Sequence, residues 1–305
     1  MDIRILRLET HNAAENMAID EAIYRAVDRG KSPPTIRFYK WKPSAISIGR
    51  NQNINTVNLE KIKNRNENNK SKIEDSTVDN KEKIKENKDE RERRVDIVRR
   101  PTGGNLVYHD ENDLTYSVIF PLNMFKDLRD AYKQICGWLI NGLKKIGVDA
   151  EFYGNNDIVF SGKKIIGSAQ HNTERTILQH GAIFFQPSKD KWMNYTNFDF
   201  FGNGDKIRDK MKDLAFIKNI KDITFKDLLD AISEEFVANN KITQKIDNKK
   251  NKIQERRLIE EGELTEEEKI EVERLVKEKY SNAIWNYGTG EEKKGDICAI
   301  DIRDD

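Results

Sequence analysis

The sequence is poor in cysteine, histidine and proline, and it has no long apolar run. Its 305 residues include two cysteines, four histidines and six prolines. Two cysteines at unrelated positions make no disulfide framework, and no His, Cys, Asp or Glu spacing typical of a zinc site occurs. No segment approaches the roughly 20 apolar residues that cross a bilayer, and residues 1–4 begin no signal sequence. We expect a cytoplasmic protein that does not associate with membranes.

An excess of charge of one sign is also missing. Lys and Arg total 54 and Asp and Glu total 53, which leaves a formal net charge of +1. This balance gives no reason to expect nucleic acid or an anionic membrane as a partner. The sequence is instead rich in charge of both signs, because 35% of its residues are charged and 36% are hydrophobic. These fractions predict an adequate core beneath a strongly polar surface.

Two polar tracts interrupt the globular pattern. Residues 61–94 contain 21 charged residues among 34 and no glycine or aromatic residue. So little apolar surface does not offset the entropy of ordering a chain, so we predict a disordered insertion. Residues 239–257 form a smaller tract of the same kind, and residues 291–305 form a polar tail. The remainder predicts one domain over residues 1–290.

The expected helices and strands alternate without clear parallel β-α-β units. Asn12 with Glu15 three residues later predicts a capped helix that ends near Gly30, and Thr265 with Glu268 predicts another helix start. A further helix is expected over 125–146, and strands over 36–39, 45–48, 114–120, 157–160, 163–169 and 181–186. This order predicts an α+β fold with a mixed, largely antiparallel sheet and helices on one side.

Residues 99–110, RRPTGGNLVYHD, combine two arginines with a pair of glycines. Glycines let the backbone approach a ligand closely, and the N–H groups of such a turn can cradle an anion. Arginine is the usual partner of phosphate and carboxylate. The segment therefore indicates a phosphate or acid site, although a tight hairpin turn with surface arginines fits about equally well.

A second polar segment, residues 155–170, reads as a hairpin with a Ser161-Gly162 turn. Strand alternation places Lys164 on the same face as Ile166, where it could stabilise a reacting carboxylate and phosphate. Two solvent-facing lysines are the more common reason for such a pair. His180, in the strand expected at 177–185, either lines the same site or makes a hydrogen bond within the core.

Neither cysteine is a good candidate for a nucleophile. Cys136 lies on the apolar half of the 125–146 helix, and Cys298 lies in a charged tail without a neighbouring base. Buried helical cysteines usually pack without reacting. We do not expect covalent cysteine catalysis.

Five segments together resemble the lipoate–protein ligase A family, whose relatives include the biotin ligases and octanoyltransferases. The resemblance covers most of the chain outside the polar tracts and implies a class II synthetase or biotin-ligase-like fold. The segments are residues 16–22 (NMAIDEA), 48–53 (IGRNQN), 99–110, 156–169 (NDIVFSGKKIIGSA) and 279–287 (KYSNAIWNY).

The resemblance implies an ATP-dependent lipoate–protein ligase. Lipoic acid would react with ATP and Mg²⁺ to give lipoyl-AMP, and a lysine of a lipoyl-domain protein would then take the lipoyl group. Lys164 matches the family's essential lysine, and Asp157 is a weaker candidate for Mg²⁺. The positions that match the ATP and lipoyl-adenylate site are Arg50, Arg100, Thr102, Gly103, Gly104, Asn105, Leu106, Val107, Tyr108, His109, Asn156, Asp157, Gly167, Ser168, Ala169 and His180.

One departure from the family pattern leaves the identity of the substrate open, whereas the lack of a cysteine favours the ligase over one group of transferases. The third glycine and the following alanine of the family are Asn105 and Leu106 here, and Leu106 adds bulk near the expected pocket. Octanoyltransferases that form a cysteine thioester carry that cysteine near residue 155, where this chain has none. A transferase that relies on the lysine alone remains open, as does a catalytically silent lipoyl-binding module. Biotin ligase is less favoured, because that group's glycine-arginine loop is not visible.

The expected partners are lipoyl domains of the 2-oxoacid dehydrogenase E2 subunit or the glycine cleavage H protein. Only 18 residues follow Tyr287, fewer than the roughly 40 that a domain needs. We therefore expect a separate accessory subunit, or activity without one.

Overall fold

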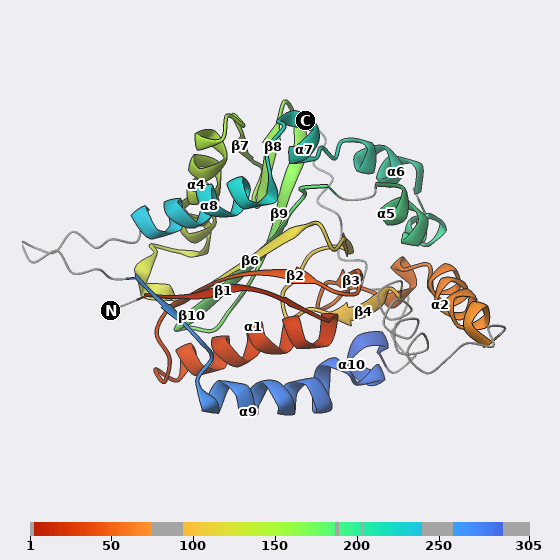
Figure 1. Cartoon of the computed structure of the whole chain (residues 1–305), viewed down its shortest axis with the longest axis horizontal. Helices are drawn as coiled ribbons and strands as arrows, with labels where there is room; N and C mark the ends of the chain where they lie inside the picture. The colour runs from red at the N-terminus through yellow and green to blue at the C-terminus, as the bar shows by residue number, and fades with distance from the viewer. Residues whose placement is uncertain (1–2, 75–93, 187–188, 203, 240–258, 289–305) are drawn as a thin grey trace, which may run out of the picture.

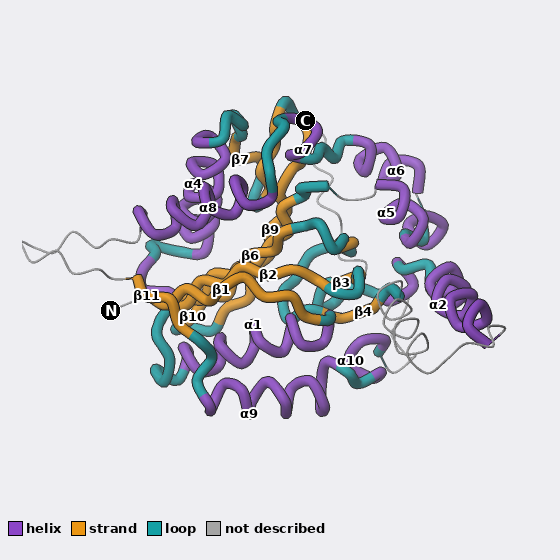
Figure 2. The backbone as a smooth tube through the Cα atoms, viewed as in Figure 1, coloured by secondary structure: helices purple, strands orange, loops and turns teal. Residues whose placement is uncertain are grey.

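A large twisted β-sheet lies between two helical layers in the computed structural model (Figures 1 and 2). The structure describes residues 3–74, 94–186, 189–202, 204–239 and 259–288. Helices α4 and α8 cover one face of the sheet, and α1 and α9 lie on the other (Figure 1). None of the helices within these ranges is long and apolar enough to cross a membrane.

The large sheet has eight strands in the order β11-β1-β2-β6-β10-β9-β8-β7. β1 pairs in parallel with β11 and with β2, and the other neighbours are antiparallel. The predicted mixed, largely antiparallel sheet is confirmed, whereas the expectation of helices on one side only is wrong. The strands are β1 (Ile3–His11), β2 (Thr35–Trp41), β6 (Leu114–Pro121), β7 (Glu151–Tyr153), β8 (Asp157–Phe160), β9 (Lys163–Asn172), β10 (Thr176–Ile183) and β11 (Ile259–Gly262).

A smaller sheet, in the order β4-β3-β5, sits beside the large one. Its strands are β3 (Ala45–Ile48), β4 (Asp96–Arg99) and β5 (Val107–His109). The helices are α1 (Ala13–Asp28), α2 (Leu59–Glu74), α4 (Leu128–Lys145), α5 (Lys189–Tyr195), α6 (Gly204–Lys212), α7 (Ile217–Ile220), α8 (Phe225–Asn239), α9 (Glu266–Leu275) and α10 (Ala283–Tyr287). Short helical turns are η1 (Ile54–Thr56), η2 (Leu122–Met124), η3 (Phe198–Phe201) and the π-helical η4 (Val276–Tyr280).

Strand alternation divides the core between the two faces of the large sheet. Tyr116 and Val118 of β6 pack with α4 and α8, whereas Ile119 packs with α1. β10 divides in the same way, with Ile177 toward α4 and Leu178 toward α1. Because both faces are covered, these strands read as nearly continuous apolar runs, and the sequence alone could not assign each residue to a face.

The expected capping boxes are both present. The Asn12 side chain accepts from the Glu15 amide at the start of α1, and Thr265 does the same with Glu268 at the start of α9. The helix predicted over 125–146 is α4, capped by Asp127. These helices were predictable because their signals are local in sequence.

Part of the predicted disordered insertion is helical. Residues 61–74 belong to α2, and the remainder of the polar tract, residues 75–93, lies outside the described residues. Ile62 is buried in the cluster around Ile46, and Arg65 donates a hydrogen bond of 2.6 Å to the hydroxyl of Tyr195. These contacts order the first turns of a segment whose composition alone favours disorder. Residues 240–257 and 291–305 of the other two polar segments also lie outside the described residues.

A buried ion pair ties α9 to the edge of the large sheet. The Arg4 guanidinium donates to both carboxylate oxygens of Glu268, at 2.7 Å and 2.6 Å. Burial alone would raise the pKa of Glu268, but the hydrogen bonds from Arg4 and from the Thr265 amide outweigh it and hold the pKa below its ordinary value. The pair therefore stabilises the charged form of Glu268 in the fold.

We predict that Glu268→Gln lowers the free energy of unfolding by about 3 kcal/mol at neutral pH, because a buried Arg4 charge loses its partner. The folded-state pKa is depressed, so this contribution is present above the unfolded-state pKa of about 4.3 and fades as pH falls through the folded value. Urea denaturation from pH 7 to pH 3 measures both effects. Glu267→Gln, whose partner Lys31 is exposed, is the matched control and should cost less than about 0.5 kcal/mol.

Candidate active site

The turn over residues 100–106, here called the glycine turn, is fastened to the end of β3. The Arg100 amide donates to Ile48 O at 3.0 Å, and the Arg50 amide donates to Thr102 O at 2.8 Å. The two chains approach so closely that a Cβ on Gly49 would lie 1.9 Å from Gly104 O. Only glycine at position 49 permits this contact, and Gly104 itself has a left-handed φ of +91°.

The Arg100 side chain shapes the glycine turn from within. Its guanidinium donates to Gly103 O at 2.7 Å, to Asn105 O at 2.8 Å and to Ser47 O at 3.1 Å. Burial lowers the pKa of Arg100 to about 10, so it stays charged at neutral pH. The expected role of Arg100 as a nucleotide ligand stays a prediction, because its hydrogen bonds in this structure go to the protein itself.

The Arg100 guanidinium therefore binds carbonyl groups of the glycine turn, but it cannot bind the amide groups of the turn. Among the described residues no group accepts a hydrogen bond from the amides of Gly103, Gly104 or Asn105, and all three residues are exposed. Backbone amides left over in a turn form a ready site for an anion or a developing oxyanion.

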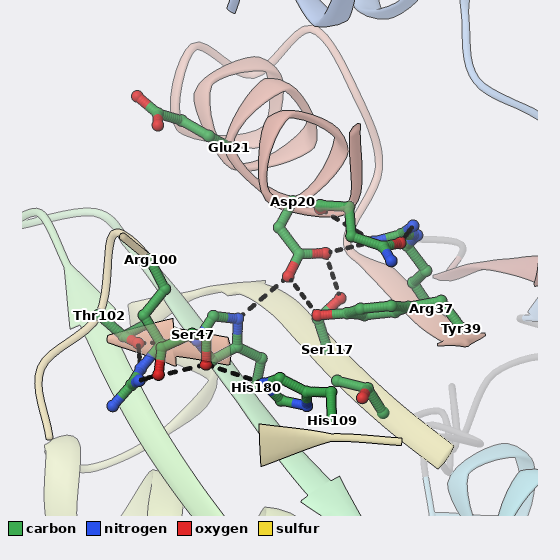
Figure 3. A network of polar contacts seen from close by, with 12 residues as sticks. Asp20, Glu21, Arg37, Tyr39, Ser47, Arg100, Thr102, His109, Ser117 and His180 are labelled. Atoms are coloured by element: carbon green, nitrogen blue, oxygen red, sulfur yellow. Dashed lines mark hydrogen bonds and ion pairs between the residues drawn. The ribbon is translucent and has the colours of Figure 1, made fainter. Parts of the chain in front are cut away.

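Thr102 connects this turn to helix α1 through His180 (Figure 3). The Thr102 hydroxyl lies 2.7 Å from His180 Nε2, and His180 Nδ1 lies 3.0 Å from Asp20 Oδ2. Asp20 has no exposed surface and also accepts from Arg37, Tyr39 and Ser117. Glu21, the next residue, points away from this network (Figure 3).

The electrostatics of the network favour a charged Asp20. Burial alone would raise the pKa of Asp20, but His180 and Arg37 outweigh it and hold the pKa below its ordinary value. His109 lies on β5, where its Nε2 is 2.8 Å from Ser47 Oγ and its ring stacks on Trp41. Burial, with Arg100 and His180 nearby, lowers the pKa of His109 well below its usual range, so its imidazole is neutral.

A bulge in β9 decides where Lys164 points. Ile158 pairs with Ile166 and Val159 pairs with Lys164, so Ile165 is an extra residue in β9. Ile165 and Ile166 are both buried against the α4 side of the sheet. The expectation that Lys164 shares a face with Ile166 is therefore wrong, because the bulge turns Lys164 to the opposite face.

On that opposite face the Lys164 side chain forms an ion pair with Asp157 and packs against Gly167. Its Nζ lies 2.7 Å from Asp157 Oδ1, and the two side chains are about one-third exposed (34% and 28%). A Cβ on Gly167 would lie 2.7 Å from Lys164 Cε, so the missing side chain makes room for the lysine. The Lys164 backbone is fixed as well, since its amide donates to Asp213 O and its carbonyl accepts from Ala215.

Strand register places the lysine and the glycine turn along one surface. Ala169 pairs with His180, and Gly167 lies two residues from Ala169 on the same face of β9. Two residues of a strand span about 7 Å. Thr102, His180, Ala169, Gly167 and Lys164 therefore follow one another across this face, with the turn amides at one end and the ammonium at the other.

Several of the predicted site residues have side chains elsewhere. The Ser168 hydroxyl lies on the α4 face, 2.7 Å from the hydroxyl of Tyr116. Leu106 and Tyr108 are buried in the apolar cluster around Ile46, which also contains Ala182 of β10. Arg50 is exposed.

Two other predicted residues, Asn156 and Val107, contact the backbone of neighbouring strands. Asn156 Nδ2 donates to Ser168 O at 2.6 Å and so braces the start of β8 against β9. Val107, half-buried on β5, pairs with Ser47 of β3. The roles given to all these residues by resemblance stay predictions.

Cys136 lies on the face of the sheet that α4 covers. It is fully buried, its Sγ is 3.8 Å from Gln179 Nε2, and burial raises its thiol pKa to about 12. Such a thiol carries almost no thiolate at neutral pH. Cys298 lies outside the described residues.

The described part of the chain holds no group of three or more His, Cys, Asp or Glu side chains that could bind a metal ion. Asp157, the candidate for Mg²⁺, is instead paired with Lys164.

Sequence reasoning missed the residues that support the site from a distance. Asp20, Arg37 and Ser117 come from three different elements, and the 213–215 segment reaches Lys164 from beyond α6. One signal was available: an aspartate and an asparagine, Asp20 and Asn16, occupy the buried face of an otherwise apolar helix. Buried polar side chains need partners, so they indicate a network even when the partners are unknown.

We predict that Gly49→Ala destabilises the protein by about 2 kcal/mol, because the new methyl group would overlap Gly104 O and push the glycine turn away from β3. Chemical denaturation measures the loss. Gly103→Ala is the matched control, since its Cβ would meet no atom within 4 Å, and it should change stability by less than about 0.5 kcal/mol. Equal stability of the two variants would contradict the close approach.

Known proteins with this sequence pattern and fold point to one family. A family model described as the lipoyl protein ligase A/B catalytic domain matches residues 12–237. An octanoyltransferase LipM from Kyrpidia tusciae is 30% identical over 311 residues, which cover 93% of this chain and 98% of the relative. An octanoyltransferase LipM from Brevibacillus brevis is 28% identical, with coverage of 93% and 98%.

Solved structures of lipoate ligases share the fold. The bi-partite lipoate protein ligase of Thermoplasma acidophilum superposes with a TM-score of 0.72 at 25% identity, covering 94% of this chain and 97% of that one. A lipoate-protein ligase A bound with ATP gives a TM-score of 0.70 at 24% identity, with coverage of 94% and 99%, and supports the fold alone.

These relatives correct the function expected from the sequence. Four curated relatives that match about nine-tenths of the chain are octanoyltransferases, so the ATP-dependent lipoate ligase is wrong as the main interpretation. The alternative of acyl transfer agrees with their names. On the match over residues 12–237 and on the fold, the chain belongs to the lipoyl protein ligase A/B catalytic domain family, whose members are lipoate or octanoate ligases and transferases.

Proposed function

We propose that this protein transfers an octanoyl group from the thioester of a carrier protein to a lysine of a lipoyl domain, without a covalent enzyme intermediate. The observation that carries the proposal is Lys164, which the β9 bulge turns toward the site face and Asp157 holds at 2.7 Å. We take the octanoyl group as the acyl group because the relatives that match over nearly their whole length are named octanoyltransferases.

The acceptor amine attacks the thioester carbonyl, and the electrons of the C=O bond move onto oxygen. The Lys164 ammonium and the amides of Gly103 and Gly104 are the donors available for this developing oxyanion. Such preorganised donors are worth a few kcal/mol each in a site that excludes water. The C–S bond then breaks, the carrier thiolate takes up the proton that the amine loses, and the amide remains on the acceptor.

A direct transfer fits the chemistry of the site better than a cysteine thioester does. Cys136, the cysteine that the structure describes, is buried behind the sheet with a pKa raised to about 12. A thioester donor is already activated, so the proposed reaction consumes no ATP and needs no Mg²⁺.

The acceptor is proposed to be a lipoyl domain of an E2 subunit or of the H protein, in the cytoplasm. A separate accessory subunit stays a prediction, which addition of such a subunit to the assay below would test.

The first test follows the intact mass of an unmodified lipoyl domain incubated with the enzyme and octanoyl carrier protein, with and without ATP. We expect an octanoyl mass increase that does not depend on ATP. We expect Lys164→Met to lower kcat/KM at least about 100-fold, because the oxyanion loses its cationic partner. Lys163→Met, an exposed neighbour that faces solvent, is the matched control and should retain activity within about 3-fold. Modification only with free acid and ATP would overturn the proposal.

A second test asks whether a thiol takes part. Cys136→Ala should transfer octanoyl at close to the wild-type rate, because its thiol is protonated and lies on the far face of the sheet. It should also lose some stability through the small cavity it leaves. Loss of transfer in a folded Cys136→Ala, or an octanoyl adduct that disappears with the cysteine, would show a covalent mechanism instead.

A further inference from the structure

We propose that Asp20 and His180 are positioning residues for this transfer, and that they act by fixing the direction of the Thr102 hydroxyl. The inference rests on the proposed function for its kinetic consequence, but its structural core can be measured without any substrate. Figure 3 shows the path: Asp20 on α1, His180 on β10, Thr102 and Arg100 in the glycine turn.

The direction of each hydrogen bond follows from Asp20. Its carboxylate is fully buried, its pKa is held below the ordinary value, and it already accepts from Arg37. A charged carboxylate can only accept, so His180 Nδ1 must carry the proton of the 3.0 Å contact.

The same logic continues to the glycine turn. If the His180 imidazole carries its single proton on Nδ1, Nε2 is an acceptor and the Thr102 hydroxyl donates across the 2.7 Å contact. The lone pairs of Thr102 Oγ1 are then free to accept from Arg100 Nε at 3.2 Å. With this tautomer of His180, the orientation satisfies both neighbours of the hydroxyl.

Arg100 links the direction of the Thr102 hydroxyl to the conformation of the glycine turn. With Nε on Thr102, its Nη2 reaches Gly103 O and Asn105 O, and those carbonyls are drawn inward. The turn amides are thereby left for the oxyanion. Asp20 and His180 are both buried, so we expect their effect on catalysis to pass through the turn.

Asp20→Asn keeps the size of the side chain but removes the charge that pairs with the buried Arg37, so it should lower stability as well as disturb this order. The asparagine amide can donate to His180 Nδ1, which moves the imidazole proton to Nε2 and forces the Thr102 hydroxyl to turn away. We expect kcat to fall about 10- to 100-fold, less than for the complete loss of an oxyanion donor, with KM within about 3-fold.

Thr102 tests the other end of the path. Thr102→Val removes the hydroxyl at constant volume and should give a similar fall in kcat, whereas Thr102→Ser should restore it. Ser117→Ala is the matched control, because Ser117 donates to the other oxygen of Asp20 at 2.9 Å but lies off the path to the turn. It should lower stability while kcat stays within about 3-fold.

The deciding measurement is nitrogen NMR of protein labelled in its four histidines, with His180→Gln used to assign the signal. We expect the neutral Nδ1–H tautomer for His180 in the wild type and in Ser117→Ala, and the Nε2–H tautomer in Asp20→Asn. An Nε2–H tautomer in the wild type would overturn the inference, and so would wild-type kcat in Thr102→Val. If the wild type transfers no octanoyl group, the proposed function is wrong. The tautomer of His180 still tests the hydrogen-bond path, because that measurement needs no substrate.

Discussion

The buried carboxylate of Asp20 is the constraint on which the centre of this molecule depends. A charge without exposed surface costs several kcal/mol unless it is fully paired, and Asp20 is paired from three strands. Arg37 and Tyr39 come from β2, Ser117 from β6 and His180 from β10. Helix α1 can therefore dock on the large sheet in one rotational and axial position only. An apolar face alone would tolerate small slips, whereas this carboxylate does not.

Local signals account for the part of the fold that the sequence predicted. Both capping boxes lie within four residues, and the alternation of helices and strands that indicated an α+β fold is read over short windows. β1 and β11 were missed because their pairing joins residues 3–6 to residues 259–262, and β11 follows a polar tract that carries no strand signal. The start of α2 was missed because Ile62 and Arg65 gain their contacts only from distant residues.

The candidate site shows the same limit. Lys164 and the glycine turn were found from residue types and from the resemblance, but strict alternation assigned Lys164 to the wrong face. A bulge is one extra residue, and nothing in KKIIGSA distinguishes it from a regular strand. Arg100 was recognised as important, yet its observed partners are groups of the protein itself: two carbonyls of its own turn, the Ser47 carbonyl and the Thr102 hydroxyl. Composition identifies the groups that can act, while tertiary contacts decide toward what they act.

The proposed function needs a site that stabilises charge on the acyl oxygen and places no demand on the leaving group. In the proposed reaction, the ammonium at one end of the site face and the turn amides at the other are donors for an oxyanion, whether the acyl carbon carries a phosphate or a thioester sulfur. A free acid must first be activated by a further reactant, whereas a thioester is already activated. For a thioester, the protein therefore has to position the reactants and stabilise the developing charge. The charge, on Lys164, lies on the site face of the sheet, whereas the Cys136 thiol is buried on the other face. In the proposed mechanism the carrier's own thiol is the leaving group, so transfer from a thioester requires no cysteine nucleophile on this chain.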